Sequence, residues 1–198
     1  MLSTLRRQAG TGLVVLIVFT VLCGIVYPFA VWGVSRIPGL SASAEGTGST
    51  PVVAVDPVAD DPNADPYFHT RPSASSEDVL GPADTTTSGG SNKAQDSGDL
   101  LETISRRRAL IAQREGVAPD AVPADAVSAS ASGLDPDISP DYADLQTARV
   151  ARVTGLPVPR VQELVAAATD GRILGFLGES TVNVPELNAA IADARRGR

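Results

Sequence analysis

The pattern of hydrophobic positions begins with one uninterrupted apolar stretch. No charged residue lies between Gln8 and Ser35, and the apolar core of this stretch covers the 22 residues 13–34. At ~1.5 Å per residue, that core forms a helix of roughly 33 Å, which matches the hydrocarbon thickness of a bilayer. The pattern therefore predicts a transmembrane helix over residues 10–35, in which Pro28 is tolerated because it lies in the outer third.

The basic residues that flank this helix predict its orientation. Arg6, Arg7 and the N-terminus outweigh Arg36, so the positive-inside rule places residues 1–9 in the cytoplasm and the rest of the chain outside. The alternative is a cleaved signal peptide, since Ala42-Ser43-Ala44 has the small-x-small form of a cleavage site. The apolar region of a signal peptide is much shorter than this one, which favours the membrane anchor.

Small residues within the helix predict a packing surface. Thr20 and Gly24 are four positions apart, so they lie on one face where another helix can approach closely. A bare anchor explains the helix equally well. The single cysteine, Cys23, lies inside the span, so no intrachain disulfide can hold the outer part together.

After the span, the polar and apolar pattern predicts a linker and then a small, α-rich α+β extracytoplasmic domain. Residues 36–66 are rich in Gly, Ser, Thr, Ala, Pro and Asp and are predicted to be the linker, with a candidate short strand at 51–55. The domain is predicted over residues 67–198. Within it, residues 75–98 and 128–137 have no hydrophobic period and are predicted to be loops.

Four helices and two extended segments are predicted within the domain. The first two helices each have a capping side chain before them and a glycine after them. The predicted helices, with their flanking signals, are 100–115 (Asp99, Gly116), 140–154 (Ser139, Gly155), 159–168, and a last helix that Pro185 opens. The predicted extended segments are 122–127 and 181–184. The expected inward faces are Leu100, Leu101, Ile104, Ala109 and Ile111; Tyr142, Leu145, Arg149, Val150 and Val153; Val161, Leu164, Val165 and Ala168; and Leu187, Ala190, Ile191 and Ala194.

The net charge of the domain limits the classes of partner that we expect it to bind. All 23 acidic residues follow Arg36, whereas only 13 of the 16 Lys and Arg residues do, so this part carries about ten net negative charges. Nucleic acid is not an expected partner, because phosphate binding needs clustered cations. The only basic cluster is predicted on the exposed face of the first helix and consists of Arg106, Arg107, Arg108 and Arg114. Large apolar side chains are few, so we expect the domain to gain stability from a partner.

The single histidine is the first candidate for chemistry. His69 would need Ser88 with Asp78 or Asp84 to build a hydrolase triad, yet the sequence has no Gly-x-Ser-x-Gly elbow. One histidine without cysteine ligands also makes a poor transition-metal site. We therefore favour a partly buried histidine that bonds a neighbouring loop, with no catalytic residue and no metal ligand.

Two further segments have a weak signal for ligands. Residues 88–93, Ser-Gly-Gly-Ser-Asn-Lys, have the glycines and the cation of a phosphate-binding nest, but they lack the Walker pattern, and a flexible loop is favoured. The acidic residues of the linker lack the spacing of a calcium loop, so a solvated segment is favoured. These acidic residues are Asp56, Asp60, Asp61 and Asp65.

Several segments together resemble the C subunits of the bacterial Kdp potassium-transporting P-type ATPases (KdpC). They keep their order and spacing over residues 67–191, after one N-terminal span. The segments are Tyr67-Phe68-His69-Thr70-Arg71-Pro72-Ser73-Ala74, Ser88-Gly89-Gly90-Ser91-Asn92, 122–125, 127–135, 138–140, Gln146 with 149–151, Gly178, 182–184 and 187–188. Residues 49–55 and 93–97 depart from the family pattern.

The resemblance implies an accessory, non-catalytic subunit of a high-affinity ATP-driven potassium import pump in the bacterial cell membrane. The implied partners are a channel-like potassium-translocating subunit (KdpA), the P-type catalytic subunit (KdpB), a small single-span subunit (KdpF) and the lipid bilayer. The family description is a catalytic chaperone that raises ATP affinity, with no cofactor bound directly and with ATP and potassium handled through the complex. The predicted topology separates the domain from cytoplasmic ATP, which favours a docking role.

The resemblance also marks residues as interface or fold-critical. These are Tyr67, Phe68, Arg71, Pro72, Ser73, Ser128, Ser130, Ser132, Gly133, Leu134 and Asp135. The candidates for packing in the membrane, Thr20 and Gly24, come from their spacing alone. The alternative function is a membrane-anchored extracellular hydrolase or cation-binding module that acts alone.

Overall fold

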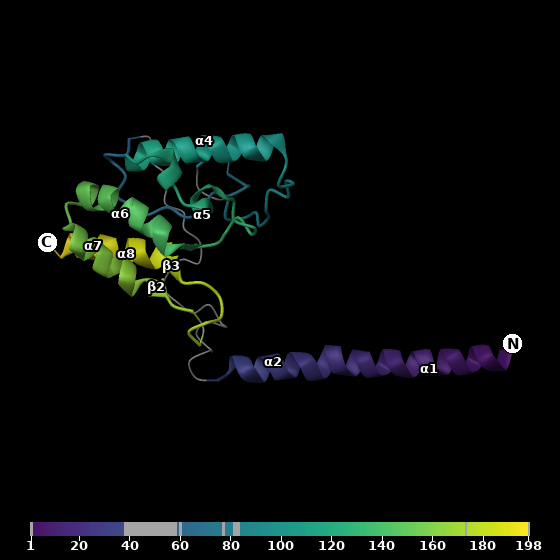
Figure 1. Ribbon diagram of the computed structural model, residues 1–198. Helices are drawn as coiled ribbons and strands as arrows, with labels where there is room; N and C mark the ends of the chain where they lie inside the picture. Colours follow the sequence, from purple (N-terminus) through teal and green to yellow (C-terminus); the bar gives the residue numbers. More distant parts are fainter. Residues whose placement is uncertain are drawn as a thin grey trace. The chain divides into compact units, whose positions relative to one another are not determined.

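The structure is a computed structural model that describes residues 2–37, 59, 61–76, 78–80, 84–172 and 174–197. The chain divides into two compact units, with the boundary between Ser49 and Thr50 (Figure 1). The candidate strand at 51–55 and the predicted cleavage site lie outside the described residues.

The first unit contains a helix of membrane-spanning length. It consists of α1 (Leu2–Val21), a π-helical turn η1 (Leu22–Val26) and α2 (Tyr27–Ser35), which run on as one rod in Figure 1. The segment Arg6–Ser35 has a window with a mean hydropathy of 2.7, and none of that window is buried within the protein. The predicted apolar helix is therefore confirmed.

Pro28 accounts for the π turn. A proline has no backbone N–H, so the carbonyl of Gly24 lacks its usual partner four residues ahead. Immediately before it, the N–H of Tyr27 bonds the carbonyl of Leu22, five residues back. The chain thus widens one turn and continues as a helix beyond the proline.

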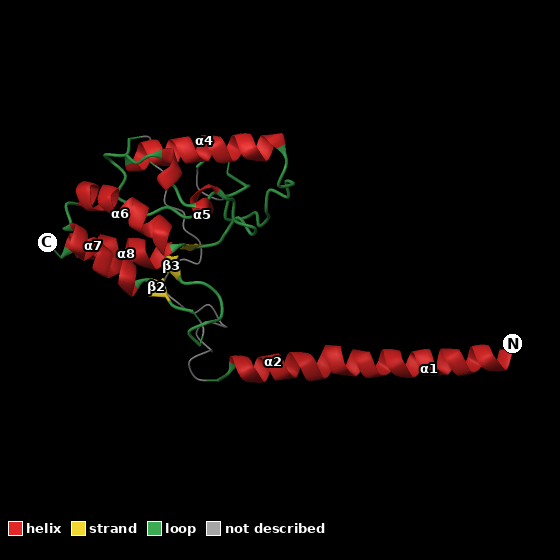
Figure 2. Cartoon of the chain, in the orientation of Figure 1, coloured by secondary structure: helices red, strands yellow, loops and turns green. Residues whose placement is uncertain are grey.

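The second unit is built mainly from helices (Figure 2). The first predicted helix is present, but it begins at Gly98 rather than after Asp99, which lies in its first turn. The third predicted helix begins at Val158, one residue earlier than predicted. The extended segment predicted at 122–127 is wrong for residues 124–127, which form a short helix, whereas Val122 and Pro123 are extended after a 3₁₀ turn. The helices are α4 (Gly98–Glu115), η2 (Pro119–Ala121), α5 (Ala124–Val127), α6 (Pro140–Thr154), α7 (Val158–Ala167) and α8 (Val184–Arg196).

The caps of α6 and α8 show why these helices begin where they do. Ser139 Oγ accepts a hydrogen bond from the N–H of Tyr142 at 3.1 Å, as the sequence predicted. Asn183 Oδ1 likewise accepts from the N–H of Glu186 at 3.0 Å. Each helix places a proline in its first turn, where no intrahelical N–H bond is lost.

A small antiparallel sheet lies beside the helices. Its strands are β1 (Asp137–Ile138), β2 (Thr169–Asp170) and β3 (Thr181–Asn183), in the order β1-β3-β2. Val182 of β3 pairs with Ile138 on one side and with Thr169 on the other. β3 was predicted. The two-residue strands were not, because they are too short to show alternation.

One hydrophobic core joins the sheet to the inner faces of the helices. Its fully buried side chains come from all parts of the domain and include Phe68, Ile111, Val150, Val161, Val182 and Leu187. On α4 the predicted faces need correction. Leu101 and Ala109 are exposed, whereas Arg107 and Arg114, which were predicted on the exposed face, are buried.

Candidate functional site

The segment 65–73, which carries the first family-like motif, is held by two side-chain amides. Gln146 on α6 accepts from the N–H of His69 at 2.8 Å and donates to its carbonyl at 3.1 Å. Asn188 on α8 makes the same pair of bonds with Phe68, at 2.8 and 2.9 Å. Each amide replaces the backbone partner that a neighbouring strand would offer. This segment is therefore fixed in the core without belonging to the sheet.

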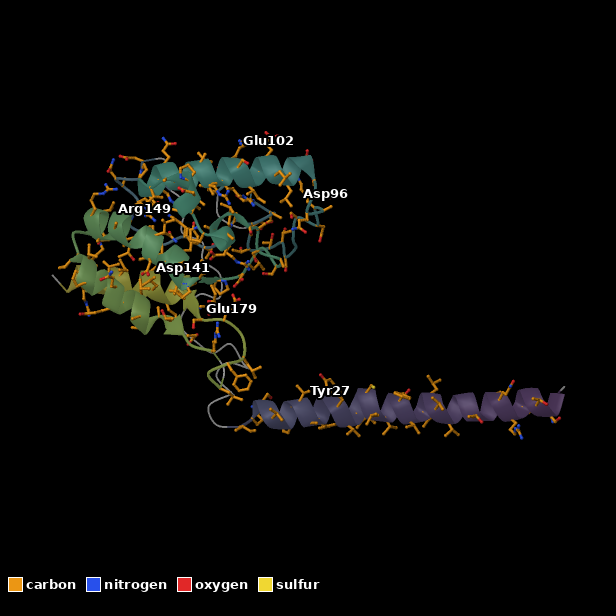
Figure 3. The ribbon with its side chains drawn as sticks, in the orientation of Figure 1. Tyr27, Asp96, Glu102, Asp141, Arg149 and Glu179 are labelled. Carbon is orange, nitrogen blue, oxygen red and sulfur yellow. The ribbon has the colours of Figure 1, made fainter. Side chains whose placement is uncertain are left out.

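Arg149 is the centre of a buried charge network, which we define as Asp65, His69, Glu115 and Arg149. Its guanidinium donates to the backbone carbonyls of Asp65 and Tyr67, at 2.7 and 2.9 Å. It also contacts both oxygens of Glu115 at 3.1 Å and lies 3.3 Å from the carboxylate of Asp65. Figure 3 labels Arg149 on α6. One cation therefore ties α6, the end of α4 and the segment 65–67 together.

His69 is a structural member of this network. Its Nε2 lies 2.7 Å from Asp65 Oδ2, and both side chains are buried. Burial lowers the pKa of His69 to about 4, and the contact with Asp65 only partly opposes this effect. Burial raises the pKa of Asp65, but the hydrogen bond and charge of His69 and the charge of Arg149 outweigh it, so the net pKa is lowered. At neutral pH a neutral imidazole thus donates to an ionised carboxylate.

The ring of His69 contacts Asp65 of its own segment. The residues considered for a triad have other partners, since the carboxylate of Asp84 accepts from Thr86 and Thr87 and Ser88 bonds the carbonyl of Ser132. His69 is buried rather than partly buried, and its favoured non-catalytic role stays a prediction. Asp65 itself was predicted to lie in a solvated acidic linker, and this prediction is wrong because its side chain is fully buried.

A second cluster brings together the segments that the sequence marked. We call residues 128–135 the serine loop. Arg71 forms an ion pair with Asp135 of this loop, and the N–H of Ser130 bonds the carbonyl of Pro72 at 2.9 Å. The N–H of Gly89 bonds the carbonyl of Ser132 at 2.7 Å. The serine loop therefore lies between the first motif and the Ser-Gly-Gly-Ser-Asn segment.

This packing changes the interpretation of the glycine-rich segment. Its first residues are occupied by contacts within the protein, since Ser88 and Gly89 both bond the carbonyl of Ser132. A Cβ on Gly90 would lie 3.0 Å from the carbonyl oxygen of Ala131. Gly90 thus allows close approach of two backbones. The segment is a loop, as predicted, and its flexibility stays a prediction.

Gly133 is the position of the serine loop that is most sensitive to substitution. Its φ is +73°, and a Cβ would lie 2.8 Å from Ser73 Oγ and 3.0 Å from the carbonyl oxygen of Gly89. Gly133→Ala therefore combines left-handed strain with a clash, and we expect it to lower the free energy of unfolding by about 2–4 kcal/mol. Chemical denaturation of the full-length protein measures the effect.

The control is Gly116→Ala, at the end of α4. Gly116 has nearly the same φ, +70°, but no atom within 4 Å of the added Cβ. Its expected cost is about 1 kcal/mol, from strain alone. Equal effects of the two substitutions would contradict the tight contact between the three segments.

The marked residues divide by exposure. Phe68, Pro72, Ser73, Ser130 and Gly133 are buried, whereas Ser128 and Ser132 are exposed, and Tyr67, Arg71, Leu134 and Asp135 lie between. Burial favours a role in the fold for the first group.

Among the described residues, no group of three His, Cys, Asp or Glu side chains could hold a metal ion.

An exposed apolar tip lies on the loop between β2 and β3. Leu174 is 78% exposed, Phe176 68% and Leu177 49%, and we call these three residues the apolar tip. The N–H of Gly175 bonds the carbonyl of Arg172 at 3.0 Å, so the backbone turns at this point. Sequence reasoning missed the tip, because no periodic pattern distinguishes it from a buried turn. Clustered exposed apolar side chains indicate a contact surface.

Comparison with known proteins gives matches along nearly the whole chain. Residues 9–193 match the family described as KdpC: K+-transporting ATPase, c chain. The potassium-transporting ATPase KdpC subunit of Kineococcus radiotolerans is 46% identical over 200 residues, which cover 98% of this chain and 97% of that protein. The KdpC subunit of Streptomyces coelicolor is 39% identical over 213 residues, with 97% and 95% covered.

Proposed function

Because the chain belongs to the KdpC family of potassium-transporting ATPase subunits, we propose that it assembles and stabilises such a pump and does no chemistry of its own. The proposed partners are a channel-like potassium-translocating subunit, a P-type ATP-hydrolysing subunit and a small single-span subunit. The chain assists ATP hydrolysis by favouring one conformation of its partners through differential contact. The match over residues 9–193 is the observation that carries this proposal.

The described residues support docking through two surfaces. The helix over Arg6–Ser35 is long and apolar enough to cross a membrane, and none of its hydropathy window is buried within the protein. The apolar tip leaves three large side chains in solvent on a domain that otherwise has one closed core. The apolar tip gains stability when a partner covers it, because apolar area is removed from water. In the bilayer, the helix can associate with a partner helix through close van der Waals packing. We propose that the helix packs against the membrane part of the pump and that the apolar tip contacts its channel-like subunit.

The proposed topology places the N-terminus in the cytoplasm and the domain outside the cell. Arg6 and Arg7 precede the helix and only Arg36 follows it closely, which supports this orientation. In this topology the bilayer separates the domain from cytoplasmic ATP. The proposed assistance to ATP hydrolysis therefore acts through the partner subunits and not through direct contact with the nucleotide.

Affinity purification of the tagged full-length protein from detergent-solubilised membranes tests the assembly. We expect two larger membrane proteins to copurify with the wild type. The double substitution Phe176→Ser and Leu177→Ser is expected to lower their recovery at least several-fold, because it removes apolar area from the contact. The control is Leu101→Ser on α4, which alters a similarly exposed apolar side chain away from the apolar tip.

The outcomes separate the parts of the proposal. Wild-type protein that emerges alone would contradict the role as a pump subunit and favour a module that acts by itself. Full recovery with the double variant would exclude only the apolar tip as the contact. Protease added to intact cells should digest the domain. Protease added to inverted membrane vesicles should leave it intact. The reverse pattern would contradict the topology.

A further inference from the structure

A pocket opens beside the cluster of family-like segments. It has a volume of about 380 Å³ and lies between the first motif, the glycine-rich segment and the N-terminal half of α4. Its wall includes Ser73, Ser91, Lys93, Thr103 and Arg107. This volume is within the range of small-molecule sites and exceeds what a bare inorganic ion fills. The proposed pump function assigns no role to this pocket.

Arg107 is the unusual side chain in this wall. It is only 6% exposed, and its guanidinium donates to two backbone carbonyls, those of Val79 and Val127, each at 3.2 Å. Among the described residues, no carboxylate lies within ion-pair distance of it. Burial lowers the pKa of Arg107, because its cation loses the stabilisation that water would give. A buried cation is normally paired with an anion, because desolvation of a single charge is costly.

The other groups in the wall fit an oxyanion. Lys93 supplies a second positive charge, and its 3.6 Å ion pair with Asp99 is exposed, so it is weak and can be exchanged. Ser91 adds a hydroxyl group to the wall, whereas the hydroxyls of Ser73 and Thr103 are bonded within the protein, to Ser75 and to the carbonyl of Asp99. The carboxylate in the wall, that of Asp78, is exposed to solvent. Its charge is therefore well screened, and the buried side of the pocket remains positive.

We propose that this pocket binds a small molecule that carries a phosphate group, with Arg107 as its buried counter-ion and Lys93 as its outer contact. Guanidinium and phosphate form short, charge-assisted hydrogen bonds that are stronger than those to the carbonyls alone. The phosphate would also link the glycine-rich segment to α4, because each contributes one of the two cations.

Isothermal titration of the full-length protein in detergent tests the site, with inorganic phosphate and glycerol phosphate as probes at constant ionic strength. We expect saturable binding to the wild type, with glycerol phosphate the tighter ligand because the pocket is larger than one ion. Lys93→Met should weaken binding at least about tenfold, and Arg107→Met should abolish it. The matched control is Arg106→Met, the exposed neighbour on α4, which should bind as the wild type does.

Two results would overturn the proposal. One is the absence of saturable binding to the wild type. The other is equal binding by the wild type and Lys93→Met, a readout that does not depend on whether Arg107→Met folds. Reconstitution in nanodiscs then identifies the source of the phosphate. Weaker apparent binding of inorganic phosphate in zwitterionic phospholipid discs than in lipid-free detergent indicates that a lipid headgroup competes for the pocket, and equal binding indicates a soluble molecule.

Discussion

A shortened chain that keeps residues 1–37 and lacks the domain is expected to support no high-affinity potassium uptake by the assembled pump. The helix alone offers apolar surface but none of the described ion pairs and buried contacts of the domain. Of the two surfaces that we propose for docking, the apolar tip lies in the second unit and is lost with it. Growth at limiting potassium and uptake of a rubidium or potassium isotope measure the effect in cells that lack the full-length chain.

The matched control keeps the domain and replaces residues 10–35 with an unrelated apolar helix of the same length. If the domain supplies the regulatory contacts, this chain should retain part of the uptake. Wild-type uptake with the shortened chain would contradict the proposed role of the domain. Loss of uptake in both variants, with both proteins present in the membrane, would show that the helix and the domain are each required.

Arg149→Met should produce the largest loss of stability of any single substitution in the domain. The substitution keeps most of the side-chain volume but leaves Glu115 and Asp65 buried without their shared cation. It also removes the donors to the carbonyls of Asp65 and Tyr67. Removing one partner of a buried ion pair costs about 3–5 kcal/mol of the free energy of unfolding. Denaturant unfolding of the full-length protein in detergent, followed by circular dichroism, measures this loss.

Arg160→Met on α7 is the control for charge removal. Arg160 pairs with Glu163 at 2.8 Å, but both side chains are well exposed, so the expected loss is below about 1 kcal/mol. A loss of that small size for Arg149→Met would mean that the network does not hold the segment 65–69. The double substitution Arg149→Met and Glu115→Gln should be less destabilising than the two single losses added together, because the two residues are in contact.

The sequence predicted most of the helices because their signals are local. Ser139, Pro140 and Gly155 lie next to the ends of α6 that they define, and a periodic apolar face identifies the turns between them. The segment 122–127 was misassigned because alternating Val, Ala and Pro suits an extended chain and a short helix alike. The burial of Arg107 and Arg114 could not be predicted, since their partners come from distant segments.

The candidate site was predicted only as a set of segments. The family resemblance identified residues 67–73, 88–92 and 128–135, and the structure brings these three together. The roles of their residues depend on contacts between distant positions, which are 44 apart for Ser88 with Ser132 and 120 apart for Phe68 with Asn188. No periodicity or spacing encodes such pairs, so the buried charge network and the apolar tip appeared only in three dimensions.

The π turn at Leu22–Val26 has a consequence for neighbours in the bilayer. One additional residue in a turn rotates everything that follows by about 100° around the helix axis. A stripe of side chains that faces a given direction along α1 therefore does not continue in that direction along α2. The two halves of this single helix can thus pack against two different helices, one in each leaflet. A protein with one span can then connect two neighbours that need not touch each other.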